Sequence, residues 1–178
     1  MHVHTEAPSQ YLVDHIALLK TAATHNALDV ACGKGRNSIF LAQNGFDVTG
    51  LELNPESIAA ARAAAAMLGV PVTIEDKDLE TGEAELPLAA YGVVCVFYYL
   101  NRPLLQAIRN AVAPGGFAIY ETFLIDQHER WGRPRRKEFA LGHNELLDLF
   151  MGFRIHHYEE VVDEENESAA ARIVAQRV

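Results

Sequence analysis

The chain has 178 residues and a formal net charge of −9 at pH 7, which argues against broad binding to nucleic acid or to an anionic membrane. Its length fits one domain with a sizeable core, and no run approaches the roughly 18 consecutive apolar residues of a membrane helix. The first residues lack the basic and then apolar order of a secretory signal. The two cysteines, Cys32 and Cys95, favour reduced thiols and a cytoplasmic location.

The first elements surround a glycine-rich turn. Residues 10–23 are typical of an amphipathic helix, and residues 27–31 form a short apolar run that suits a buried parallel strand. Gly33 and Gly35 follow, and glycine lets the backbone adopt positive φ and approach a ligand closely. A second helix is predicted to run on through residues 38–42. Because such a turn presents free backbone N–H groups at the carboxyl end of a strand, it predicts a ligand site.

A second strand, from Phe46 to Leu51, ends in an acidic residue, Glu52. Glu52 lies about 20 residues after the first glycine, where nucleotide-binding sheets place an acid that binds the ribose hydroxyls. The hydrogen bonds to such a carboxylate are charge-assisted. A carboxylate at this position would repel a 2′-phosphate, so the sequence argues against NADP.

The middle of the chain predicts a helix and two further strands. Asn54 is a good helix cap, and Gly69 ends the alanine-rich helix that follows. A third strand begins near Val72, and residues 81–87 form an acidic connection. Residues 93–97 are the most apolar strand, which we expect to be central and buried on both faces.

Aromatic residues leave the carboxyl end of this central strand. Phe97, Tyr98 and Tyr99 are expected to face the crevice in which open α/β sheets bind ligands. A cation over an aromatic face is stabilised by about 0.5–2 kcal/mol. One or two of these rings could instead fill the core.

The remaining strands follow a helix and a turn. Residues 103–113 predict a helix, residues 114–116 a sharp turn, and residues 117–122 a fifth strand. Two further strands, at residues 155–161 and 170–178, flank an acidic turn. A short helix is expected between them and the fifth strand, near residues 144–150.

The segment from Asp126 to Lys137 is the strongest local basic feature of the chain. Its basic residues are Arg130, Arg133, Arg135, Arg136 and Lys137. Guanidinium groups suit oxyanions, so the segment could recruit an anionic acceptor, or its charges could simply face water.

The histidines do not predict a metal site. His156 and His157 are adjacent in a probable strand, so their side chains are expected on opposite faces. No Cys/His spacing matches a zinc site. His2 and His4 could share a metal ion at the terminus. The candidates for a catalytic base are His128 and His143, which flank the arginine-rich segment.

Taken in order, these motifs resemble those of the class I S-adenosylmethionine (SAM)-dependent methyltransferases. The resemblance covers roughly residues 25 to 160. It rests on Asp-Val-Ala-Cys-Gly-Lys-Gly-Arg-Asn-Ser at 29–38, Gly-Phe-Asp-Val at 45–48 leading to Glu52, Asp78-Leu79, Tyr-Tyr-Leu-Asn-Arg at 98–102 and Ala-Pro-Gly-Gly-Phe at 113–117. The Gly-Arg-Asn-Ser ending and residues 132–146 are similar to the tellurite-resistance branch.

The resemblance implies an α/β fold: a Rossmann-like, doubly wound, seven-stranded mixed sheet with helices on both faces. The implied strand order is 3-2-1-4-5-7-6, with strand 7 antiparallel. Residues 1–178 would form a single domain. Within it, residues 1–23 would be an N-terminal lid region, residues 123–150 a substrate-side insertion, and residues 153–178 a C-terminal β-hairpin.

The resemblance also implies the cofactor and the site. SAM would be bound, and S-adenosylhomocysteine (SAH) would be the product. The cofactor-binding residues would be Tyr11, Asp29, Cys32, Gly33, Gly35, Arg36, Asn37, Glu52, Leu53, Asp78, Leu79 and Phe97. The acceptor would lie near the catalytic group of Tyr98, Tyr99, Asn101, Glu121 and Arg133. Tyr11 is a candidate lid residue or an edge tyrosine packed on the sheet. Asp78 would accept from the adenine amino group, or be a solvated turn carboxylate.

The implied reaction moves a methyl group to a small-molecule acceptor, such as a chalcogen oxyanion or a thiol, by a monomer or homodimer. Such a transfer needs positioning and water exclusion more than a base. Two departures from the family pattern are Gly92, where an aspartate is usual, and Arg135-Arg136-Lys137, where arginine-asparagine-proline is usual. The rival hypotheses are an NAD-dependent oxidoreductase, which the short C-terminal part disfavours, and a SAM-binding module without catalysis.

Overall fold

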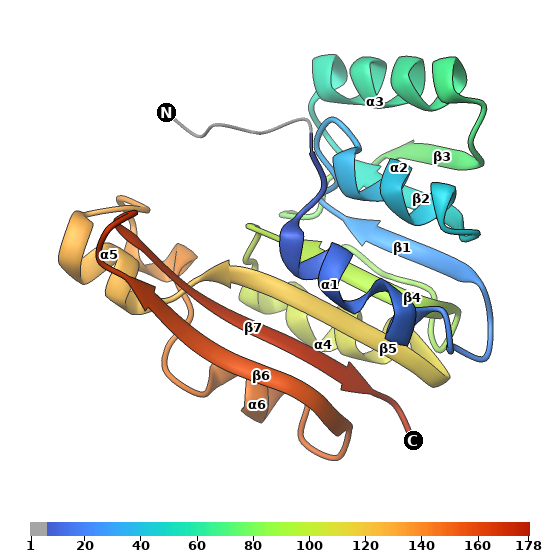
Figure 1. The fold of residues 1–178 in the computed structure, drawn as a ribbon. Coiled ribbons are helices and arrows are strands. Elements are labelled where there is room, and N and C mark those ends of the chain that lie inside the picture. Colours follow the sequence, from blue (N-terminus) through green and yellow to red (C-terminus); the bar gives the residue numbers. More distant parts are fainter. Residues whose placement is uncertain (1–6) are drawn as a thin grey trace.

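The computed structural model describes residues 7–178 and contains a seven-stranded sheet in the order β3-β2-β1-β4-β5-β7-β6 (Figure 1). Neighbouring strands from β3 to β5 are parallel, and β7 is antiparallel to both β5 and β6. The predicted strand order is therefore confirmed. The strands are β1 (Asn26–Val30), β2 (Asp47–Glu52), β3 (Val72–Asp76), β4 (Tyr91–Phe97), β5 (Val112–Phe123), β6 (Arg154–Asp163) and β7 (Ser168–Gln176).

Helices cover both faces of this sheet (Figure 1). The helices are α1 (Gln10–Leu19), α2 (Arg36–Gln43), α3 (Pro55–Leu68), α4 (Arg102–Ala111), α5 (Ile125–Trp131) and α6 (Glu145–Leu149), with a 3₁₀ turn at Lys137–Phe139. The apolar residues of α1 and α2 pack on one face, and those of α4 and α6 pack on the other. Within residues 7–178, none of these helices has the length and apolar character needed to cross a bilayer.

Local sequence explains most of these boundaries. The Asn54 side chain accepts a hydrogen bond from the Ser57 N–H at 3.0 Å, and Gly69 ends α3 with φ +64°. Every residue of β4 after Tyr91 is buried, as expected for a strand covered on both faces. Gly92, the second residue of β4, lies close to a neighbouring backbone segment: a Cβ there would lie 1.8 Å from the Thr24 carbonyl oxygen.

The structure corrects three sequence-based boundaries. The helix predicted over residues 10–23 ends at Leu19. The turn predicted at residues 114–116 lies within β5, which starts at Val112. The two glycines belong to a β-bulge, which is marked by a register shift opposite Tyr91 and Val93. The arginine-rich segment contains α5, whose Gly132 cap has φ +66°.

The two adjacent histidines do not point to opposite faces. A register shift between Ile155 and His157 marks a β-bulge in β6, and His156 is its extra residue. The His156 ring lies 5.6 Å from the ring of Phe117, and His157 contacts Tyr11 directly. Phe117 and Tyr11 belong to the same core cluster, so both histidines lie on the same face of the sheet. The prediction of alternating faces is therefore wrong, because a bulge resets the two-residue period of a strand.

Candidate active site

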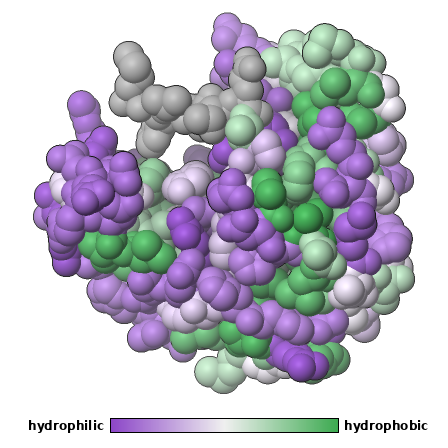
Figure 2. Space-filling model, viewed as in Figure 1, coloured by the Kyte–Doolittle hydropathy of each residue, from purple (hydrophilic) through white to green (hydrophobic). Residues whose placement is uncertain are grey.

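A large open cavity lies at the carboxyl ends of β1, β4 and β5. Its volume is about 1650 Å³, and its wall includes α1, the loop after β1, the first turn of α2 and parts of β6 and β7. The cavity continues along the surface between α2 and α3. Figure 2 shows this face hollowed between the α5 end of the molecule and the end that carries α1 and α2. The position is the one at which open α/β sheets bind ligands.

The glycine-rich turn forms one wall of the cavity. Gly33 has φ +56°, and a Cβ built there would meet no atom within 4 Å, so the space above this backbone is open to a ligand. Gly35 has φ +79°, and a Cβ there would lie 3.0 Å from the Ala61 Cβ. Gly33 thus leaves room for a ligand, whereas Gly35 lets α2 approach α3.

Glu52 joins the turn to the end of β2. One carboxylate oxygen accepts the Gly33 N–H at 2.9 Å, and the other accepts the N–H groups of Leu53 at 3.0 Å and Asn54 at 2.9 Å. Three backbone donors therefore fix this carboxylate at the cavity wall. A ligand hydroxyl placed beside it would find an oriented, charged acceptor.

Asp29 lies beneath the turn and supports it. The side chain is 2% exposed, and its Oδ2 accepts a hydrogen bond from the Ser38 hydroxyl at 2.5 Å. This bond ties the end of β1 to the first turn of α2. Burial raises the pKa of Asp29 from 3.8 to about 6, although the Ser38 and Cys95 side chains act in the opposite direction.

The raised pKa of Asp29 predicts a pH-dependent stability. The folded protein holds this proton more tightly than the unfolded chain. The Asp29 contribution to the free energy of unfolding therefore falls as the pH rises from about 4 to about 6. Two pH units correspond to about 2–3 kcal/mol. We expect Asp29→Asn to gain stability relative to the wild type over this window, as measured by urea unfolding of the ligand-free protein. Asp47→Asn, at an exposed site on β2, controls for loss of one charge; equal gains in both variants would contradict the prediction.

Residues 7–9 are attached to the glycine-rich turn and to β5. The Arg36 guanidinium donates to the Ala7 carbonyl at 3.0 Å, and the Asn37 Oδ1 accepts the Ser9 N–H at 2.8 Å. The Ser9 hydroxyl donates to Glu121 Oε2 at 2.9 Å. Arg36 and Asn37, predicted to hold the cofactor, thus line the cavity while they hold the chain that precedes α1.

Glu121 is the centre of a polar cluster opposite the turn. It is 3% exposed, and its Oε1 accepts hydrogen bonds from the Tyr98 hydroxyl at 2.9 Å and from the Arg172 Nε at 3.2 Å. Arg172 also pairs with Glu159 at 3.1 Å. Tyr98 has φ +54°, which costs free energy in a residue other than glycine and is frequent at functional sites.

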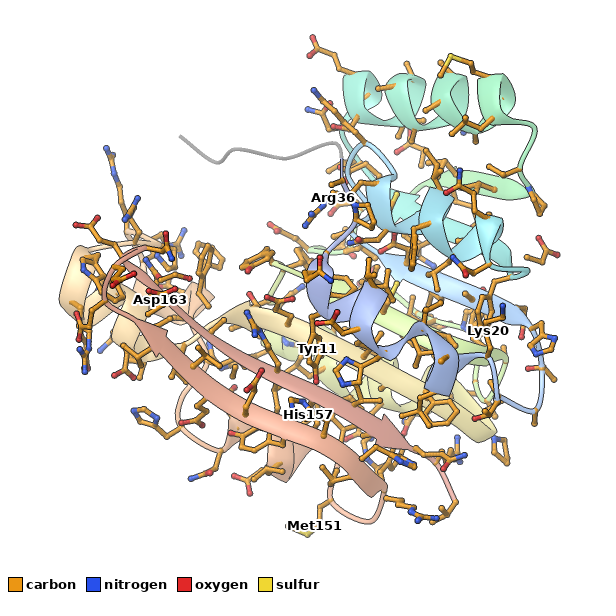
Figure 3. All side chains as sticks on the ribbon, in the orientation of Figure 1. Tyr11, Lys20, Arg36, Met151, His157 and Asp163 are labelled. Carbon is orange, nitrogen blue, oxygen red and sulfur yellow. The ribbon has the colours of Figure 1, made fainter. Side chains whose placement is uncertain are left out.

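Three rings from α1 and β6 complete this side of the cavity. Figure 3 shows Tyr11 and His157 side by side, and the Tyr11 hydroxyl lies 2.9 Å from His157 Nδ1. The His15 ring packs 4.4 Å from that of Tyr11, centroid to centroid, and the Arg172 guanidinium lies 5.6 Å from the Tyr11 ring centroid. The cation and the aromatic face stabilise one another.

Three other predicted residues also line the cavity: Cys32, Phe97 and Tyr99. Burial raises the pKa of the Cys32 thiol, with Asp29 and Glu52 adding to the effect, so this thiol is protonated at neutral pH. The Tyr99 hydroxyl is buried, and the described part of the chain gives it no hydrogen-bond partner.

Several predicted residues lie outside the cavity wall. The Arg133 guanidinium pairs with Glu167 at 3.2 Å, so its position does not support the predicted role at the acceptor. Four other predicted residues also lie outside the wall: Asn101, Asp78, Leu79 and Leu53. Asn101 donates to the Leu79 carbonyl at 2.8 Å, and Asp78 accepts the Glu80 N–H at 2.9 Å. Leu79 is buried in the core, and Leu53 is half-exposed.

The histidines predicted as bases are also distant from the cavity wall. His128 contacts the Pro134 carbonyl at 2.7 Å, and the exposed His143 lies between Asp126 and Glu160. His2 and His4 lie outside the described residues. Within residues 7–178, no group of three or more His, Cys, Asp or Glu side chains is arranged to hold a metal ion.

The sequence analysis gave no role in the site to Ser9, His15, His157 or Arg172, although all four line the cavity. Their positions depend on the crossing of α1 over the sheet and on the β6 bulge. The antiparallel register of β5 and β7 places Arg172 directly opposite Glu121. That pairing follows from the register of the hairpin, which no local motif specifies.

Comparisons with known proteins agree with this fold. A model of the family described as a methyltransferase domain matches residues 27–116, half of the chain. The ubiquinone biosynthesis O-methyltransferase of Photorhabdus laumondii is 35% identical over 99 residues, which are 53% of this chain and 41% of that protein. The protein of the same name from Chromobacterium violaceum is 30% identical over 114 residues, covering 62% and 49%. The chain thus spans less than half the length of these curated relatives.

Solved structures show the same fold. TehB from Haemophilus influenzae superposes with a TM-score of 0.76 at 20% identity, over 93% of this chain and 62% of that one. An S-adenosylmethionine dependent methyltransferase from Mesorhizobium loti superposes with a TM-score of 0.74 at 19% identity, over 95% and 99%. With the family match and the 3-2-1-4-5-7-6 sheet, these likenesses show that the chain belongs to the methyltransferase domain family, as a class I SAM-dependent member.

Proposed function

We propose that this chain binds SAM in the cavity and transfers its methyl group to a small-molecule acceptor. One observation carries the proposal: a single cavity has the Gly33–Glu52 pair on one wall and the Tyr98–Glu121 cluster on the other. The first pair suits a nucleoside with free ribose hydroxyls. The second places an aromatic ring and a carboxylate where a positive sulfur and an acceptor would meet.

The residues fit the cofactor that the family takes. The open backbone at Gly33 and the oriented Glu52 carboxylate would hold the nucleoside, and Asp29 would act by supporting the turn. The adenine roles of Asp78 and Leu79 stay predictions from the resemblance. When bound, SAM supplies an electrophilic methyl group on a positively charged sulfur. The task of the chain is to orient the acceptor and exclude water.

The acceptor would lie beside Tyr98, Tyr99 and Glu121. The resemblance to the tellurite-resistance branch favours a chalcogen oxyanion or a thiol, and the names of the curated relatives add oxygen acceptors. Arg133 is not part of this proposal, because its guanidinium pairs with Glu167 and neither residue lines the cavity. Both cysteines are free and buried, which supports the cytoplasmic location proposed from the sequence.

Calorimetric titration of the purified protein with SAH, with NAD as the control ligand, tests the proposal first. We expect micromolar binding of SAH and no heat from NAD. Methyl transfer from labelled SAM is then measured with tellurite, selenite, thiols and catechols. Absence of SAH binding would overturn the proposal, and binding without transfer to any acceptor would favour the non-catalytic module.

A further inference from the structure

The side of the cavity opposite the glycine-rich turn contains a phenol hydrogen-bonded to an imidazole. The Tyr11 hydroxyl, from α1, lies 2.9 Å from Nδ1 of His157, from β6, and both residues line the cavity (Figure 3). His15 Nδ1 contacts the Tyr11 carbonyl at 2.8 Å and therefore donates to it, which holds the His15 ring against Tyr11. The resemblance predicts Tyr11 as a cofactor-binding lid residue, but it gives no role to His157 or to the contact between the two.

Tyr11 keeps its proton, and its hydroxyl lies within hydrogen-bond distance of the imidazole. Burial raises the pKa of Tyr11 far above its usual value, and the carboxylates of Glu159 and Glu121 raise it further, while Arg172 lowers it. In the His157 tautomer that carries its proton on Nε2, the Tyr11 hydroxyl donates and His157 Nδ1 accepts. A neutral imidazole that accepts at Nδ1 has its proton on Nε2, so the basic nitrogen of His157 is reached through Tyr11.

From this geometry we propose that Tyr11 and His157 form a proton relay that deprotonates an acceptor hydroxyl during methyl transfer. The inference rests on the proposed function and names the acceptor class: a phenolic hydroxyl. As the acceptor oxygen forms its bond to the methyl carbon, the methyl–sulfur bond breaks and its electron pair stays on sulfur. The acceptor proton moves to the Tyr11 oxygen, and the Tyr11 proton moves to His157 Nδ1, which leaves a neutral phenol and an imidazolium.

The surrounding charges suit this proton movement. The groups that face the pair are His15 on α1, Glu159 on β6, Arg172 on β7 and Glu121 on β5. Two carboxylates thus accompany one guanidinium, so a positive charge that forms on the pair during the transfer has carboxylates nearby.

The rest of the wall suits an aromatic acceptor. The rings of Tyr98 and Phe123 pack with their centroids 5.1 Å apart, and both residues line the cavity with Phe97 and Tyr99. Aromatic rings prefer the offset and edge contacts that such a wall offers. A phenolic hydroxyl also requires the loss of a proton on methylation, whereas an ionised thiol does not.

Two probes with the same ring separate these chemistries: catechol, whose hydroxyls are protonated at pH 8, and thiophenol, which is mostly ionised at that pH. We expect the wild type to methylate catechol. His157→Asn should lower kcat for catechol about 100-fold, in the range for loss of a general base. It should leave the transfer to thiophenol and the KM for SAM within about 2-fold. Tyr11→Phe should have the same effect on catechol.

His156→Asn is the matched control. This neighbouring histidine contacts Gln176 and Phe117 and does not line the cavity, so its replacement should leave the catechol rate unchanged. Side-chain ¹⁵N NMR of the cofactor-free protein gives a second readout that is independent of turnover. At pH 8 we expect an unprotonated Nδ1 in His157, whose signal moves in Tyr11→Phe while that of His156 does not.

The outcomes separate this inference from the proposed function. Transfer to thiophenol but not to catechol, an unchanged catechol rate in His157→Asn, or a protonated Nδ1 in His157 would each overturn the relay. Absence of SAH binding, or of transfer to either probe, would overturn the proposed function itself.

Discussion

Glu52→Gln is expected to weaken SAH binding about 100-fold, which corresponds to about 2.7 kcal/mol. The carboxylate accepts the Gly33 N–H on one oxygen and the N–H groups of Leu53 and Asn54 on the other. An amide has only one accepting oxygen, so its NH₂ group would face a backbone donor on one of the two sides. The variant would lose both the charge offered to the ribose and the alignment of the glycine-rich turn.

The measurement is calorimetric titration with SAH, together with thermal unfolding to show that the variant is folded. Glu75→Gln is the matched control, because Glu75 is exposed on the neighbouring strand β3 and does not line the cavity. A folded Glu52→Gln protein with wild-type affinity would remove Glu52 from the site.

Gly92→Ala is expected to lower the free energy of unfolding by about 3 kcal/mol. A Cβ at Gly92 would lie 1.8 Å from the Thr24 carbonyl oxygen, and backbone cannot move aside as a flexible side chain can. Moving β4 away would also strain the hydrogen bond from the Gly92 N–H to the Asn26 side chain, which is 3.0 Å long. The aspartate that is usual in the family at this position would meet the same obstacle.

Urea unfolding of the ligand-free protein measures this loss. Gly142→Ala serves as the control, because the nearest atom to its added Cβ would be a side-chain oxygen of Glu145 at 3.6 Å, an ordinary contact. Equal free energies of unfolding for the two variants would contradict the prediction, because they would mean that the Thr24 backbone shifts to make room for the added Cβ.

The sequence predicted the features that depend on local patterns. Gly33 and Glu52 were placed correctly on one wall, because a glycine-rich turn and an acid at the end of the next strand obey a fixed spacing in this architecture. The apolar run of β4 identified the central strand, and the hairpin after β5 followed from the family resemblance. These signals lie within about 25 residues of one another or in the order of the motifs.

The remaining site residues depend on distant parts of the chain. His157 lies in the wall because of a bulge at His156, and no residue type marks that bulge in the sequence. Arg172 reaches Glu121 through the register of β5 and β7, 51 residues apart in sequence. Arg133 differs for the opposite reason: its local charge pattern is strong, but its guanidinium pairs with Glu167, at the turn between β6 and β7, and does not line the cavity.

The two outer strands of the sheet have a consequence for how molecules of this protein meet in solution. Edge strands offer unpaired backbone groups to another chain, and like charges along them oppose such pairing. The outer strand β3 has exposed Glu75 and Asp76, and the outer strand β6 has Glu159, Glu160 and Asp163. With a net charge of −9, two copies that approach edge to edge bring carboxylates together. We therefore expect edge-to-edge association to be disfavoured at neutral pH and low salt, and to become easier as acid or salt reduces the repulsion.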